Sequence, residues 1–150
     1  MRPLLILASL LALAACSLPA ADKESDADAR ALFEEIRTGA DLAQDPHLAP
    51  ELKTPDALAQ LAAVRNLLPP GAPTKVENRS WNYQTTNDGS VAMLVHAYVY
   101  PGHTVLAETV LHKSPGQKTW SIAGFHVHLD SPPGDNRAPV TVDGPPGTKT

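Results

Sequence analysis

The chain has 150 residues, of which 12 are basic and 16 acidic, so its formal net charge is −4. This length suits one domain with a single core, and the acidic balance argues against nucleic acid as a partner. The single cysteine cannot form an internal disulfide, so this thiol must serve another purpose if it is used at all.

The N-terminal stretch is typical of a signal peptide. Arg2 supplies a positive charge, and residues 4–15 are apolar except for Ser9. Because a membrane-spanning helix needs about 20 apolar residues, this run is too short to be one. We therefore expect a signal peptide over residues 1–15.

The lone cysteine follows this apolar run directly. Leu13-Ala14-Ala15-Cys16 resembles the lipobox of bacterial lipoproteins. The resemblance implies that the chain is cut before Cys16 and that acyl chains, palmitate among them, then anchor Cys16 to a membrane. Ser17 in place of an aspartate favours the outer membrane, with the domain facing the periplasm. The alternative is an ordinary signal peptide cut after Ala14, which leaves Cys16 unmodified.

Both ends of the remaining chain are predicted to be unpacked. Residues 16–25 are small and polar and are expected to form a tether from the lipidated Cys16. Residues 131–150 contain two Pro-Pro-Gly sequences and few large apolar side chains, so we expect a disordered tail. Residues 26–130 then form the domain.

Two helices are expected at the start of this domain. Ser25 or Asp26 is suited to cap the first, and Gly39 is placed to end it. The apolar residues of the first helix are Ala29, Leu32, Phe33 and Ile36.

The second helix should begin with Thr54 as its cap and Pro55 as its first residue, and a Pro-Pro-Gly sequence at 69–71 should end it. A short helical start is also expected at Asp45-Pro46. The predicted buried stripe of the second helix consists of Leu58, Leu61, Ala62, Val64 and Leu68.

After residue 74 the pattern changes to strands separated by turns. Turn signals at 87–89, 101–102 and 115–116 divide the stretch into four strands, and such short links make neighbouring strands antiparallel. The expected strands are 76–85, 90–100, 104–113 and 119–130. The predicted fold is α+β, with N-terminal helices packed on a curved four-stranded antiparallel meander.

The last of these strands changes its apolar phase. Trp120 and Ile122 share one face, whereas Phe125, Val127 and Leu129 share the other. A β-bulge at Gly124 would bring all five side chains to the same face.

The order of elements, together with the Trp-Ser-Ile-Ala-Gly-Phe sequence at 120–125, resembles the cystatin-like and nuclear transport factor two-like superfamily. The resemblance implies a cone-shaped sheet with a pocket between sheet and helix. It implies no single activity, because members of this superfamily include enzymes, binding modules and accessory domains.

Two sets of residues are candidate sites. His126 and His128 lie on one strand face, and with His96, His103 and His112 they would suit zinc or copper if the strands bring them together. The ordinary interpretation is histidines on a sheet face. A ligand or interface surface is predicted from Trp81, Tyr83, Tyr98 and Tyr100, which are otherwise core or edge-strand residues.

Arg65 and Arg79 are expected to lie along the surface or to pair locally. Since no catalytic motif is present, we expect a non-catalytic lipoprotein without a cofactor, anchored through Cys16. Its domain would bind a small apolar ligand, a peptide or another envelope protein. The alternatives are an enzyme that uses the cone as its active site and a histidine-based metal-binding protein.

Overall fold

The structure is a computed structural model that describes residues 20–130 and 140–143, with side chains described for residues 23–130. The predicted signal peptide, Cys16 and the first tether residues lie outside the described residues. The described elements are α1 (Ala20–Thr38), η1 (Leu42–Gln44), η2 (Pro50–Lys53), α2 (Pro55–Leu67), β1 (Lys75–Thr86), β2 (Gly89–Tyr100), β3 (His103–Lys113), β4 (Ser121–Asp130) and β5 (Val140–Asp143).

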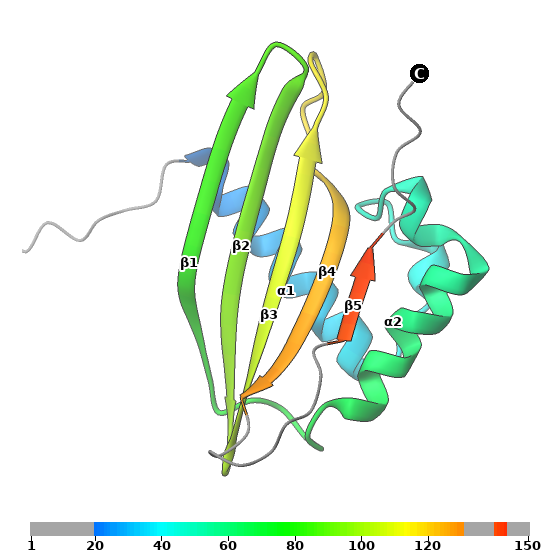
Figure 1. Cartoon of the computed structure of the whole chain (residues 1–150), viewed down its shortest axis with the longest axis vertical. Coiled ribbons are helices and arrows are strands. Elements are labelled where there is room, and N and C mark those ends of the chain that lie inside the picture. The colour runs from blue at the N-terminus through cyan, green and yellow to red at the C-terminus, as the bar shows by residue number, and fades with distance from the viewer. Residues whose placement is uncertain (1–19, 131–139, 144–150) are drawn as a thin grey trace, which may run out of the picture.

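The strands form one antiparallel sheet in the order β1-β2-β3-β4-β5. Figure 1 shows a curved sheet with α1 crossing one face and α2 beside β5. This arrangement confirms the predicted α+β class and the meander from β1 to β4. The fifth strand is additional, because four residues of the expected disordered tail pair with β4. The rest of that tail lies outside the described residues.

Helix α1 starts earlier than predicted. It begins at Ala20, within the expected tether, so Ser25 and Asp26 lie inside the helix and do not cap it. Its end is as predicted, because Gly39 takes a φ of 76° and its N–H donates to the carbonyl of Glu35 over 2.9 Å.

The core lies between α1 and the sheet. The Phe33 ring stacks on that of Tyr98, with centroids 3.5 Å apart and planes within 8°. The predicted apolar face of α1 is buried, and from the sheet it meets side chains of alternate residues on β2, β3 and β4. The space between α1 and the middle of the sheet is thus filled by aromatic and aliphatic side chains.

Helix α2 begins as predicted, with the Thr54 hydroxyl accepting a hydrogen bond from the backbone N–H of Ala57 over 3.3 Å. Leu61 and Val64 are buried, but the prediction that Ala62 is buried is wrong. One residue advances a helix by about 100°, which turns Ala62 away from the core.

The predicted helical start at Asp45-Pro46 is also wrong. Asp45 follows the short helix η1, which is capped by the Asp41 carboxylate. Helix η2 begins later, at Pro50.

The predicted bulge in the last strand is confirmed. Val110 pairs with Gly124 and Leu111 pairs with Ile122, which leaves Ala123 as the extra residue. Phe125 therefore faces α1 together with Ile122. A second bulge, at Arg79 in β1, was not predicted.

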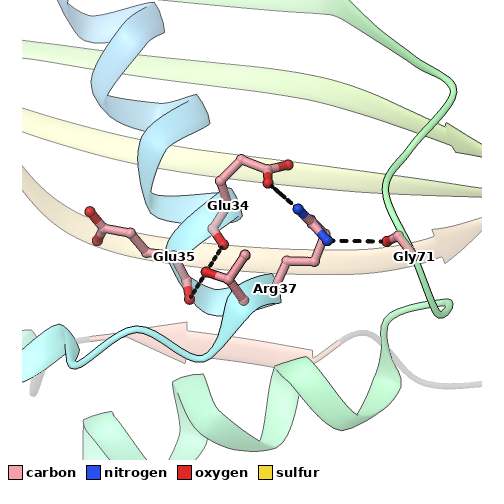
Figure 2. Close-up of polar contacts among 5 residues, drawn as sticks. Glu34, Glu35, Arg37 and Gly71 are labelled. Atoms are coloured by element: carbon pink, nitrogen blue, oxygen red, sulfur yellow. Dashed lines mark hydrogen bonds and ion pairs between the residues drawn. The ribbon is translucent and has the colours of Figure 1, made fainter.

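One polar contact links the end of α1 to the loop after α2, beside several within α1 (Figure 2). The Arg37 Nε donates to Glu34 over 3.0 Å, and its Nη1 donates to the carbonyl of Gly71 over 3.4 Å. The Thr38 hydroxyl donates to the carbonyl of Glu34 over 2.7 Å. Of these contacts, only the Arg37–Gly71 hydrogen bond crosses from α1 to the loop after α2, and the others lie within α1.

Candidate functional site

A cavity of about 400 Å³ lies where the end of α1, helix η1 and helix α2 meet. Its volume falls in the range of small-molecule sites. Apolar side chains from all three elements line it, and polar groups stand among them. The apolar lining residues include Ile36, Leu42, Leu58 and Ala62, and the polar ones include Asp41, Arg65 and Asn66.

Arg65 extends from α2 along the edge of the cavity to the end of α1. A Cβ atom added to Gly39 would lie 2.3 Å from its Nη1, so the guanidinium packs directly against this glycine. The C-terminal end of a helix carries partial negative charge, which favours a cation there. Among the described residues, no carboxylate forms an ion pair with Arg65.

The other charged group of the cavity is already engaged. Asp41 accepts a hydrogen bond from the backbone N–H of Ala43 over 3.1 Å, as the cap of η1. An arginine of fixed charge and a capping aspartate do not form a general acid–base pair. The cavity is therefore suited to holding a ligand with an apolar body and a polar group that accepts hydrogen bonds from Arg65.

A second cluster of charged residues lies beneath α1. The His96 Nε2 is 2.7 Å from Asp26 Oδ1, and the Arg30 Nε is 2.8 Å from Asp26 Oδ2. The Asn78 side-chain amide donates to the same Asp26 Oδ1 over 3.3 Å. Helix α1 is thus joined to β1 and β2 through one carboxylate.

The electrostatics of this cluster favour a neutral imidazole beside a carboxylate. Burial, together with the charge of Arg30, lowers the pKa of His96 more than the nearby Asp26 raises it. Burial also raises the pKa of Asp26, but His96 and Arg30 together outweigh burial and leave this pKa below its usual value. With Asp26 ionised, His96 donates its Nε2 proton to the carboxylate.

Neither Asp26 nor His96 lines the α1–α2 cavity. His96 is only 1% exposed. The pair links helix α1 to strand β2. The sequence did not predict this contact, because Asp26 and His96 are 70 residues apart.

The four predicted aromatic residues do not form one surface. Tyr98 and Tyr100 lie in the core, and burial raises the pKa of each hydroxyl. Tyr83 is half-buried, with its ring edge-on to Trp120 at 5.6 Å between centroids. Of the four, Trp81 alone is exposed, at 51%.

The histidines do not converge. His126 and His128 alternate along β4 with Phe125 and Val127, which are buried under α1, so both histidines lie on the opposite face of the sheet from His96. Among the described residues there is no group of three or more side chains able to hold a metal ion. Arg79 pairs with Glu77 over 3.1 Å, as the local-pairing prediction expected.

Comparison with known proteins gives no match: no family model, no curated protein and no solved structure is similar to the chain. Within residues 20–130 and 140–143, no helix combines the length and the apolar character that crossing a membrane requires.

Proposed function

We propose that this chain is a non-catalytic binding lipoprotein, held by a lipidated Cys16 on the outer membrane with its domain facing the periplasm. The domain binds a small, largely apolar ligand in the cavity between α1 and α2. The observation that carries the binding role is this cavity of about 400 Å³, with apolar walls and the Arg65 guanidinium at its edge. A cystatin-like origin of the α+β fold is part of the same proposal.

The packing supports the cavity beside α2 as the ligand site, rather than a pocket between sheet and helix. The stacked rings of Phe33 and Tyr98 occupy the middle of that layer. The side chains beside α2 leave space instead, and they offer both apolar contact and a hydrogen-bonding cation.

The anchor is tested by the substitution Cys16→Ser. We expect the wild-type chain to sediment with membranes, and the variant to appear in the soluble fraction or as an uncut precursor, because it lacks the thiol that acyl transfer requires. A variant that still sediments and migrates as the wild type does would contradict the lipoprotein proposal.

The cavity is tested by native mass spectrometry of the chain purified from the envelope without chelators. We expect a stoichiometric extra mass on the wild type and its loss in Ala62→Trp, because the indole would occupy the cavity. Ala63→Trp is the matched control, since Ala63 is exposed on the same helix but does not line the cavity. A bare wild-type chain, or a ligand retained by Ala62→Trp, would count against this site.

A further inference from the structure

Large exposed apolar side chains gather at one end of the sheet. Among the described residues, the exposed large apolar side chains are Leu67, Trp81, Val91 and Met93, each at least 40% exposed. All of these except Leu67 lie in the distal half of the β1–β2 hairpin. We call residues 81–93 the hairpin tip.

Both faces of the hairpin tip carry an exposed apolar side chain, while residues 84–90 at its end carry no large apolar side chain. Met93 pairs with Asn82 and Val91 pairs with Gln84, while Trp81 pairs with the buried Leu94. Because side chains alternate along a strand, Trp81 points to the α1 face and Met93 to the opposite face. Trp81 is therefore the exposed apolar side chain on the face that α1 covers, while Val91 and Met93 lie on the other face.

The hairpin tip lies at the same end of the molecule as the start of α1. Asp26, in the first half of α1, contacts Asn78 of β1, and Figure 1 shows the first turns of α1 beside the distal half of β1. The chain from Cys16 to Ala20 spans four residue steps, which reach at most about 14 Å when fully extended. A lipid on Cys16 therefore holds this end of the domain against the bilayer surface.

We propose that Trp81, on the face of the hairpin tip that also carries α1, lies in the interface of the membrane to which Cys16 is anchored. The proposal rests on the proposed lipidation of Cys16. Tryptophan favours the level of the lipid headgroups, where its ring meets acyl chains and its N–H meets water. The turn with Asp88 stays in water, because a carboxylate is costly to bury in hydrocarbon.

Basic side chains near the hairpin tip would suit either a phospholipid surface or an acidic protein surface. The short tether from Cys16 favours the phospholipid surface, because it holds this end of the domain near the membrane. Arg79 lies at the bulge just before the tip, and Lys113 pairs with Ser90 at its far side. Lys113 also stands 4.7 Å from the Trp120 ring centre. Arg79 is already paired with Glu77, so of these two cations Lys113 is the one that would attract anionic headgroups.

The test uses the full chain, purified from membranes with its own lipid and reconstituted into phosphatidylcholine–phosphatidylglycerol vesicles with or without bromine on the acyl chains. Bromine quenches tryptophan at short range. The chain has two tryptophans, and Trp120 is 1% exposed. We expect about a twofold loss of emission in brominated vesicles, from Trp81 at the interface.

Two variants make the result specific. Trp81→Phe leaves Trp120 alone, and its emission should be equal in both kinds of vesicle. In Trp81→Phe/Leu67→Trp the new indole replaces an equally exposed residue at the end of α2, which Figure 1 shows at the opposite end of the molecule from the hairpin tip. This variant should also escape quenching.

Equal wild-type emission in the two kinds of vesicle would overturn the proposal and leave the hairpin tip as a protein contact. Quenching of the Leu67→Trp indole would overturn it too, since lipid would then reach both ends of the domain. The intact mass of the same sample reports acylation. An acylated chain without quenching refutes the hairpin contact alone, whereas a chain without acyl groups refutes the anchor itself.

Discussion

The substitution Asp26→Ala tests whether the buried carboxylate holds α1 on the sheet. It removes the acceptor of the His96 Nε2 proton, at 2.7 Å, and leaves that donor buried without a partner. A hydrogen bond to a charged group contributes about 1.5–3 kcal/mol, and the ion pair with the partly exposed Arg30 adds less than about 1 kcal/mol. Alanine favours the helix by up to about 0.7 kcal/mol, which offsets part of the loss.

We therefore expect Asp26→Ala to lower the free energy of unfolding by about 2 kcal/mol, or the Tm by roughly 8 °C for a domain of this size. Urea unfolding followed by circular dichroism measures the first quantity and a thermal scan the second. Glu24→Ala is the control, since Glu24 is exposed on the same helix, and its effect should stay within about 0.5 kcal/mol.

A second variant separates hydrogen bonding from charge. Asp26→Asn keeps an acceptor oxygen for His96 but loses the negative charge, so its cost should lie between those of Glu24→Ala and Asp26→Ala. If Asp26→Ala costs no more than the Glu24→Ala control, the carboxylate does not hold α1, and apolar packing alone fixes the helix.

Two further predictions concern pH and backbone strain. Since burial lowers the pKa of His96, the unfolded chain binds this proton more readily, and stability should fall as pH drops below the usual value of 6.5. Urea titrations at pH 7 and pH 5.5 should show this loss in the wild type and a smaller loss in His96→Gln. Gly39→Ala should cost about 1–2 kcal/mol, because φ is positive, and its methyl group should also displace Arg65. Gly71→Ala, with positive φ and nothing within 4 Å, is the matched control and should cost a similar amount, because the flexible end of Arg65 can move aside; a Gly39→Ala cost near zero would contradict the strain argument.

The strands were predictable because local signals define them. Turn residues end each strand within two residues of its observed limit, and the apolar phase change at Gly124 identified the bulge. Helix α1 was placed too late because no serine, threonine, aspartate or asparagine stands directly before Ala20 to signal a cap. The short strand β5 was missed because it lies between proline-rich stretches that favour loops.

The candidate site was less predictable, because it depends on contacts between distant segments. The cavity combines residues from α1, η1 and α2, and only Arg65 among its polar groups was noted from the sequence. The partnership of Asp26 and His96 has no periodicity or motif to reveal it. Burial of Tyr98 and Tyr100 was equally hidden, since an alternating strand does not say which face a helix will cover.

The order of the elements also has a consequence for assembly. Each strand from β1 to β4 pairs with its neighbour in the chain, so the meander can grow by successive hairpins. Helix α1 precedes all of them, and its Phe33 has no stacking partner until the residues of β2 have been added. If the chain crosses a membrane N-terminus first, the apolar face of α1 stays uncovered until β2 has followed. At this stage the chain is most prone to aggregate or to bind a chaperone.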